Sequence, residues 1–394
     1  MIEKGEIFFG FSAVIFRVHC ADHTYCTLRF PLEAPAALIK RSAADKLGLK
    51  QGDLLLVEVK STGERIIIPD RRTCVATGLS LNGALFISPK EHLDALTPLQ
   101  EQMGPGVMDG TGSFLESVSS QELAYWLTVT DWEAFQCIHP VSGGSLQRDF
   151  AAKAPTWSFA QILNVAFIVM GFNHCYELLY KVLEGESLSG QPMTGNLDVF
   201  IRRTSELQYW AATEICLATN LSKRSALMRK FIKVAAYCQE YGNVNGALAI
   251  VSGLSTPAIS RLNHTWEKLP TRIRKVFGEL EGLTDPSRNH RRYRMYVGTL
   301  KPPVIPYMPI LLKDMTFSHE GNQTLLDSLV NFEKMHLLAQ SLRMMRACRA
   351  RSWEIPPPPS TKSEAEVRSY VTSLHVIDCE RILNQMSQRV EPRR

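Results

Sequence analysis

The chain has 394 residues, which is long enough for two domains with separate hydrophobic cores. Hydrophobic residues make up 45% and charged residues 21% of it, as in an ordinary soluble globular protein. A formal net charge of +5 is small for this length and argues against a dedicated nucleic-acid binder, although one basic face could meet an acidic partner. The nine cysteines are scattered without a CxxC pair, which predicts reduced thiols rather than disulfides or a zinc site.

Residues 1–95 have the pattern of a small α+β domain. TYCTLRFPL alternates like a half-buried strand, and APAALIKRSAADKLGL has helical spacing with Gly48 as its stop. DLLLVEVKSTGERIII then predicts two strands around an STGE turn. The order strand–strand–helix–strand–strand predicts a ubiquitin-like roll, in which one helix packs on one mixed sheet. Another small α+β domain is the alternative.

The sequence becomes helical after a linker at 96–117. Ser120 predicts the start of a helix, and apolar residues recur at helical spacing through residues 118–350. Within this region NVNGALAIVSGLSTPAISRL is apolar on nearly all sides, which predicts a central buried helix. The PPPPS run indicates an extended linker at 351–363, and residues 364–394 predict one or two short amphipathic helices.

The most apolar segment is PTWSFAQILNVAFIVMGF, residues 155–172. Its uncharged run is shorter than the roughly 20 residues of a membrane-spanning helix, and it contains Gln161 and Asn164. We therefore expect a buried or partly exposed helix rather than a transmembrane span. The first residues show no signal peptide and the last residues no lipidation motif, so we expect a cytoplasmic protein.

No motif for covalent catalysis is present in the sequence. It contains no Walker loop, no GxSxG motif and no His/Cys cluster at metal-ligand spacing. VSGGS at 141–145 is a glycine-rich turn without the lysine that phosphate binding requires. His319 beside Glu320 suggests an acid–base pair, but such neighbours are more often a surface contact. We expect no cofactor and no metal.

Two sequence blocks resemble the catalytic domain of Ras-type guanine-nucleotide exchange factors: ALAIVSGLSTPAISRLNHTWEKLP and PPVIPYMPILLKDMTFSHEGNQTLLDSLVNFEKMHLLAQSLRMMR. With ELAYWLTVTDWEAF they cover residues 118–350 in the family's order. ADHTYCTLRF, DPSRNHRRYR and VIDCERILNQMSQRVEPRR are most similar to the Epac branch, which acts on Rap GTPases. In that branch a Ras-association domain of ubiquitin-like fold precedes the catalytic domain, in agreement with the pattern of residues 1–95.

The resemblance implies a multidomain protein. An N-terminal α+β ubiquitin-like roll would precede a mostly α-helical exchange-factor catalytic domain with a protruding helical hairpin. Such a catalyst binds the nucleotide-free GTPase more tightly than the loaded one, so that binding energy is used to eject the nucleotide. This requires a rigid wedge with an apolar tip, which excludes Mg²⁺, and a carboxylate, which competes with phosphate for the GTPase's own lysine and serine.

ILLKDMTFSHEGNQTLLDSLVNFEKM resembles the family's helical hairpin. Glu320 matches the hairpin carboxylate, just ahead of Gly321 and Asn322. Phe317 and Thr316 are the two candidates for the apolar side chain that excludes Mg²⁺. Phe317 is the better physical candidate, whereas Thr316 aligns more simply.

Other residues are expected to support the hairpin. Asn243 and Asn245 resemble family positions that brace it, or they cap the helix that follows. Arg261 is grouped with this support, although we expect it to hold the core rather than touch the GTPase. For Phe317 the alternative is that it packs the hairpin base together with Met315.

The sequence departs from the family pattern in two ways. The family has an exchanger-motif module upstream, and Epac proteins also have cyclic-nucleotide-binding domains, whereas this sequence starts at the Ras-association domain. No regulation by cAMP is therefore inferred. In the family CIHP runs almost directly into a helix like YELLYKV, whereas here residues 141–175 intervene. We interpret 141–175 as an insertion: a variant exon, translated intron sequence, or a functional insert such as a membrane-touching helix.

The leading interpretation is an exchange factor for a Rap-like GTPase, recruited to membranes through a lipidated GTPase. The alternative is a catalytically inactive scaffold that binds a GTP-loaded Ras-family protein through residues 1–95. That domain could instead be a structural spacer without a GTPase partner. We expect no nucleic-acid partner, and the sequence does not identify the particular Rap or Ras protein.

Overall fold

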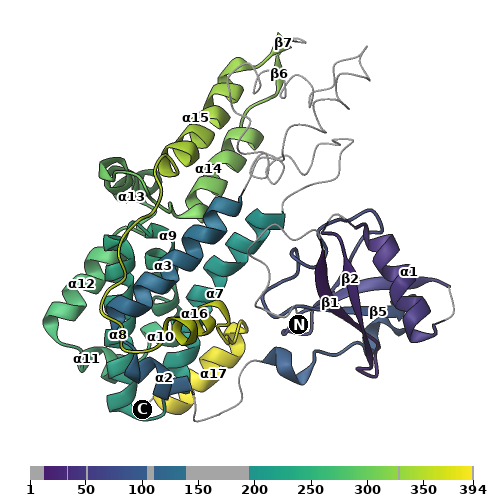
Figure 1. Cartoon of the computed structure of the whole chain (residues 1–394), viewed down its shortest axis with the longest axis horizontal. Coiled ribbons are helices and arrows are strands. Elements are labelled where there is room, and N and C mark those ends of the chain that lie inside the picture. The colour runs from purple at the N-terminus through teal and green to yellow at the C-terminus, as the bar shows by residue number, and fades with distance from the viewer. Residues whose placement is uncertain are drawn as a thin grey trace.

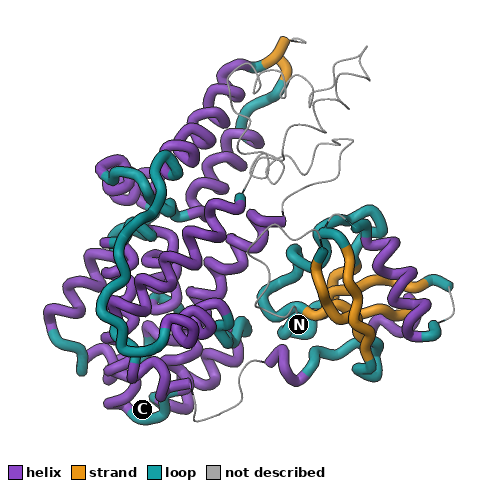
Figure 2. The backbone as a smooth tube through the Cα atoms, in the orientation of Figure 1, coloured by secondary structure: helices purple, strands orange, loops and turns teal. Residues whose placement is uncertain are grey.

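The computed structural model describes residues 13–32, 34–49, 52–103, 111–138, 195–326 and 329–392. A five-stranded sheet with one helix forms the N-terminal part, and packed helices form the rest (Figure 1). Figure 2 shows the sheet with helix α1 on one side of the molecule and the main group of helices on the other. The predicted insertion at 141–175, with the apolar segment 155–172, lies outside the described residues.

The N-terminal sheet is mixed, with the strand order β2-β1-β5-β3-β4. Strands β1 and β5 are parallel, and the other neighbouring strands are antiparallel. The side chains of Ile39 and Ala43, on the helix, belong to one buried cluster with Val18 and Leu85 of the sheet. The elements are β1 (Val14–His19), β2 (Tyr25–Phe30), α1 (Ala36–Leu47), β3 (Leu54–Val59), β4 (Arg65–Ile67) and β5 (Ala84–Pro89).

Local sequence patterns explain most of this part. Gly48 ends α1 with a φ of 65°, a left-handed conformation that costs glycine little. The predicted STGE turn joins β3 and β4, with Gly63 at a φ of 86°. Strand β5, however, was not predicted. Its short apolar run, ALFISP, has no periodicity that separates a strand from a buried helix, although it is the central strand between β1 and β3.

His19, the last residue of β1, is a buried histidine. Its side chain is 3% exposed, and its ring lies 5.3 Å from the ring of Tyr25 and 5.4 Å from that of Phe86, measured between centroids. Neither ring nitrogen has a hydrogen-bond partner among the described residues. Burial in these surroundings lowers the pKa of His19 to about 4.

We expect this histidine to make the chain less stable as the pH falls from 6.5 towards 4. In that window the unfolded chain binds a proton at His19 that the folded chain excludes, whereas above it neither state binds one. The loss reaches about 3 kcal/mol at the acid end. Thermal unfolding of His19→Phe, which keeps a ring and removes the proton, should depend less on pH than that of the parent. His92→Phe, at an exposed site, is the control, and equal pH dependence of all three proteins would refute the expectation.

The helical part is built around α9 (Val244–Leu254), which is buried along nearly its whole length, as the sequence predicted. Helices α7 and α8 pack on it, and α3 packs on both. Helix α3 begins at Ser120, as predicted, and Ser119 caps it, because the Ser119 hydroxyl accepts the backbone N–H of Glu122 at 3.1 Å. The other elements are α2 (Thr111–Ser117), α3 (Ser120–Cys137), α7 (Gly195–Leu217), α8 (Leu221–Glu240), α10 (Pro257–Ser260), α11 (Asn263–Glu267), α12 (Thr271–Glu281), α13 (Ser287–Thr299), α14 (Met308–Glu320), β6 (Leu325–Leu326), β7 (Leu329–Val330), α15 (Phe332–Cys348), α16 (Glu364–Thr372) and α17 (Glu380–Val390), with the 3₁₀ turns η1 (Lys90–Ala95) and η2 (Gln100–Met103) after β5.

The C-terminal segment, residues 351–392, packs against these helices (Figure 1). Its first stretch is extended, as predicted, and lies along α3, where the Tyr125 hydroxyl donates to the carbonyl of Ile355 at 3.1 Å. Of the one or two helices expected here, the structure has two, α16 and α17. Val367 and Leu383 on them lie in the same apolar cluster as side chains of α7, α8 and α9. The segment is therefore part of the helical core.

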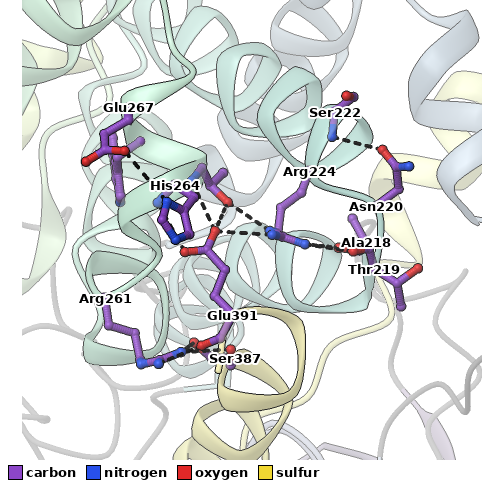
Figure 3. Close-up of polar contacts among 12 residues, drawn as sticks. Ala218, Thr219, Asn220, Ser222, Arg224, Arg261, His264, Glu267, Ser387 and Glu391 are labelled. Carbon is purple, nitrogen blue, oxygen red and sulfur yellow. Dashed lines mark hydrogen bonds and ion pairs between the residues drawn. The ribbon is translucent and has the colours of Figure 1, made fainter. Parts of the chain in front are cut away.

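Glu391, just after α17, joins this segment to α8 and α11 (Figure 3). Its carboxylate lies 3.1 Å from Nη2 of Arg224, and both side chains are buried. It also accepts the backbone N–H groups of His264 at 3.2 Å and Thr265 at 3.0 Å, in the first turn of α11, which have no partner within that helix. Burial by itself would raise the pKa of Glu391, but the hydrogen bonds from Thr265 and Arg224 lower it below its ordinary value.

The same segment joins the sheet to the helices. Asp378, between α16 and α17, accepts the hydroxyl of Ser61 at 2.6 Å and the backbone N–H of Asn82 at 3.1 Å. Arg202 of α7 donates to the carbonyl of Leu81 at 2.9 Å. A cavity of about 380 Å³ lies between the two parts beside these contacts. The C-terminal segment thus contacts both parts of the chain.

Candidate functional site

Helices α14 and α15 form an arm at one end of the helical part, named here the α14–α15 arm (Figure 1). The two helices pack against each other, and residues 321–331 join them through the short strands β6 and β7. One buried apolar cluster holds the base of the arm. The members of that cluster on the two helices are Met308, Ile310, Leu311, Met315, Met335, Leu338, Ala339, Leu342, Met345 and Cys348. The arm therefore has a packed base.

The last turn of α14 carries the predicted wedge residues. Phe317 is 64% exposed, and Glu320 is also exposed, whereas Met315 is fully buried. Phe317 therefore does not pack the base together with Met315. Thr316, four residues before Glu320, is half-buried. Residues three and four apart are neighbours on a helix surface. The carboxylate of Glu320 therefore lies near both the ring of Phe317 and the hydroxyl of Thr316, at the end of α14.

Gly321 and Asn322 shape the end of α14. The Gly321 N–H donates to the carbonyl of Phe317 at 2.9 Å, and the Asn322 side-chain amide donates to the carbonyl of Ser318 at 2.9 Å. A Cβ on residue 321 would lie 2.8 Å from the Phe317 carbonyl oxygen, closer than real contacts allow. The last carbonyls of a helix have no partner within it. The Asn322 side chain supplies a partner for one of them, and Gly321, without a Cβ, leaves room beside another.

Asn245 connects the start of the arm to the core. Its side-chain oxygen accepts the N–H of Met308, the first residue of α14, at 3.3 Å. Its side-chain nitrogen donates to the hydroxyl of Thr204 on α7 at 2.9 Å, and its backbone N–H donates to the carbonyl of Ile305 at 3.1 Å. The contacts of Asn245 thus run from the central helices to the base of the α14–α15 arm.

Asn243 and Asp131 form a second buried network beside it. The Asn243 oxygen accepts the N–H of Gly246 at 2.7 Å, which caps α9, and its nitrogen donates to Asp131 of α3 at 2.7 Å. The other carboxylate oxygen of Asp131 lies 3.1 Å from Nε of Arg203. Burial raises the pKa of Asp131, against the opposing effects of Arg203 and Asn243. Asn243 therefore both caps its helix and contacts the core. Sequence reasoning missed Asp131, although it lies in the block ELAYWLTVTDWEAF.

Arg261 lies in a different place from the one predicted for hairpin support. Its guanidinium donates to the carbonyl of Ser387 at 2.8 Å and to that of Glu391 at 2.7 Å (Figure 3). These groups belong to α17 and the residue after it, at the opposite end of the helical part from the α14–α15 arm (Figure 1). The structure thus shows Arg261 holding the C-terminal segment, because its side chain is directed towards α17.

Two further residues, which sequence reasoning missed, fasten the tip of the arm. The Asn331 side chain accepts the N–H of Lys334 at 3.2 Å, which caps α15, and donates to the carbonyl of Gln323 at 2.8 Å. The ammonium of Lys334, a side chain only 1% exposed, lies 2.8 Å from the hydroxyl of Thr324. An asparagine directly before a predicted helix is a capping signal, and it was available in NFEKM.

Replacing Asn331 by alanine should loosen this tip. We expect amide hydrogen exchange in residues 323–331 to become faster by roughly fivefold, since a lost cap costs about 1 kcal/mol. Mass spectrometry of the exchanged peptides measures this. Asn220→Ala is the matched control, because Asn220 caps α8 in the same way and lies outside the arm. Unchanged exchange at the tip of Asn331→Ala would show that the cap does not hold it.

No group of His, Cys, Asp or Glu side chains able to hold a metal ion occurs in the part of the chain that the structure describes. None of its described helices is both long and apolar enough to cross a membrane.

Residues 122–336 match the model of the RasGEF domain family, which is more than half of the chain. The chain belongs to the RasGEF domain family.

Three relatives narrow the assignment within that family. Rap guanine nucleotide exchange factor 3 of Homo sapiens is 39% identical over 397 residues, covering 94% of this chain and 39% of that protein. Rap guanine nucleotide exchange factor 5 of Rattus norvegicus is 36% identical, covering 95% of this chain and 58% of that protein. Rap guanine nucleotide exchange factor-like 1 of Pongo pygmaeus is 34% identical, covering 98% of this chain and 76% of that protein. The predicted resemblance to Rap-type members is confirmed, and the chain spans less than two thirds of the first two relatives.

Proposed function

We propose that this chain accelerates GDP release from a Rap-like GTPase by inserting the end of the α14–α15 arm beside the bound nucleotide and Mg²⁺. The observation that carries the proposal is the exposure of Phe317 and Glu320, three residues apart, at the end of a helix whose base is fully packed. In this proposal the Phe317 ring excludes Mg²⁺, and the Glu320 carboxylate competes with phosphate for the GTPase's lysine and serine.

The packed base favours this function energetically. Exchange requires tighter binding to the nucleotide-free GTPase than to the loaded one, and only that difference drives the nucleotide out. If the arm had to become ordered on binding, the cost in conformational entropy would reduce this difference in binding free energy. Here Asn243, Asn245 and the cluster beneath α14 supply order in advance, while Gly321 and Asn322 fix the turn.

Residues 1–95 we assign to a ubiquitin-like Ras-association domain. The mixed sheet with the order β2-β1-β5-β3-β4 and the single helix α1 support this assignment. Strand β2 is an edge strand, and its outward residues Tyr25 and Arg29 are exposed. Such an edge is able to pair with a strand of a GTP-loaded Ras-family protein.

The remaining boundaries of the proposed organisation follow the same packing. Residues 96–117 connect the two parts, and the exchange domain begins at 118. We place its end after α17 rather than at 350, since 351–363 lies along α3 and 364–392 shares the helical core. Recruitment to a membrane through a lipidated GTPase is part of the same proposal.

The competing function is an inactive scaffold that captures a GTP-loaded GTPase on the β2 edge. Affinities for nucleotide-free, GDP-loaded and GTP-loaded Rap, measured with the immobilised chain, separate the two. An exchange factor should bind nucleotide-free Rap roughly 100-fold more tightly than GDP-loaded Rap, and Glu320→Ala should remove that preference. A scaffold would prefer GTP-loaded Rap, would be insensitive to Glu320→Ala, and would lose binding in Arg29→Glu.

A further inference from the structure

Helix α13 presents a basic outer face next to the α14–α15 arm (Figure 1). Arg291, Arg292 and Met295 are exposed on it, at helical spacing of three and four residues, whereas Tyr293 is buried beneath. Residues 263–301 contain nine Lys and Arg against four Asp and Glu, a net charge of +5 that equals the net charge of the whole chain. The rest of the sequence is therefore balanced, and the excess positive charge lies here.

These charges have few partners within the protein. Arg288, Arg291, Arg292 and Lys301 form no hydrogen bond or ion pair with any other residue that the structure describes, and all four are exposed. Arg294 differs, because its guanidinium lies 2.7 Å from the carboxylate of Asp314 on α14. That ion pair fixes the orientation of α13 relative to the arm.

The turn at the start of α13 is strained and is held in place. Arg288, Asn289 and His290 have φ values of 52°, 55° and 55°, in the left-handed region that such residues rarely adopt. Arg294 fastens this turn, donating to the carbonyl of Asn289 at 2.7 Å and to its side-chain oxygen at 3.1 Å. A strained backbone conformation persists only where surrounding contacts hold it, and such conformations are concentrated at functional sites. A merely solvated basic face requires no such turn.

Met295 stands among these arginines and is 62% exposed. We propose that the face of α13 formed by Arg291, Arg292 and Met295, with Arg288 and Lys301 at the two ends of the helix, binds an anionic lipid membrane. Arginines on such a face attract acidic headgroups, and an apolar side chain between them enters the boundary between headgroups and acyl chains. An exposed methionine has no comparable partner on a nucleic-acid backbone, which favours the membrane.

Vesicle sedimentation tests this with the full chain. Vesicles of phosphatidylcholine with phosphatidylserine should bind it, vesicles of phosphatidylcholine alone should not, and added salt should weaken the binding. Each lost positive charge weakens partition about fivefold, so Arg291→Gln/Arg292→Gln should bind roughly 25-fold more weakly. Met295→Ser should also weaken it. Arg71→Gln/Lys90→Gln is the matched control, with the same loss of charge at exposed sites of the N-terminal part, and it should bind like the parent.

Two outcomes would overturn the proposal. Equal vesicle binding by the parent and Arg291→Gln/Arg292→Gln would show that this face is not the membrane contact. Binding of a double-stranded oligonucleotide that depends on these two arginines, without vesicle binding, would assign the face to nucleic acid instead. Neither measurement contains a GTPase, so the inference does not rest on the proposed exchange function.

Discussion

Glu320→Ala should release GDP from a Rap-like GTPase about 100-fold more slowly than the parent chain, at unchanged thermal stability. The loss is large because the carboxylate would act only where the nucleotide is displaced, so its effect appears in the rate and not in the fold. Stability should not change because Glu320 is exposed. The rate is measured by the fluorescence of a GDP analogue bound to the GTPase.

Glu279→Ala is the matched control for this experiment. It removes an exposed glutamate of α12 that lies 4.0 Å from the ammonium of Lys275, and it should exchange nucleotide like the parent. A parent-like rate for Glu320→Ala in an active chain would remove Glu320 from the mechanism. The same assay separates the two apolar candidates. Phe317→Ala should slow release about tenfold, and more than Thr316→Ala does, because Phe317 is 64% exposed and Thr316 is half-buried.

Glu391→Gln should lower the free energy of unfolding by about 3 kcal/mol. The substitution leaves the Arg224 guanidinium buried without its carboxylate partner at 3.1 Å, and it weakens the cap on the first turn of α11. Breaking one member of a buried ion pair costs more than the pair contributes, since the remaining charge cannot reach water. Denaturant unfolding at neutral pH measures the change.

Glu380→Gln is the control for this prediction. Glu380 lies at the start of the same helix, α17, and is exposed, so its replacement should change the free energy of unfolding by less than about 0.5 kcal/mol. A loss in Glu391→Gln no larger than in the control would mean that the C-terminal segment is not held by this carboxylate. Residues 364–392 would then contribute little to the stability of the helical core.

Features set by neighbouring residues in the sequence were predicted well. The spacing of apolar residues located α1 and the buried helix α9, and a glycine fixed the end of α1 at Gly48. The resemblance to exchange factors assigned Phe317 and Glu320 to a helical hairpin; both lie in the last turn of α14, and their roles there stay predictions. In each case the information is local, because helix periodicity and turn chemistry depend on residues only a few positions apart.

Features set by distant contacts were missed or misplaced. Arg261 was grouped with the hairpin support but expected to hold the core; the sequence did not show with which residue, because its partner Ser387 lies 126 residues away. Glu391 lies in the charged stretch RVEPRR, a composition typical of a solvated tail. In the structure, however, its side chain is only 8% exposed. Strand β5 is short and uniformly apolar, so only its two neighbouring strands define it. No periodicity reports such pairings, because they are fixed only when the chain is folded.

The measurement that tests the central claim most directly is the release of a fluorescent GDP analogue from Rap, with Ras as a control. The account predicts that the folded chain accelerates release from Rap, that Ras responds less, and that excess free nucleotide restores the loaded GTPase. If the folded chain bound Rap without changing the rate of release, the α14–α15 arm would not be an exchange catalyst. The chain would then be a scaffold built on the RasGEF fold.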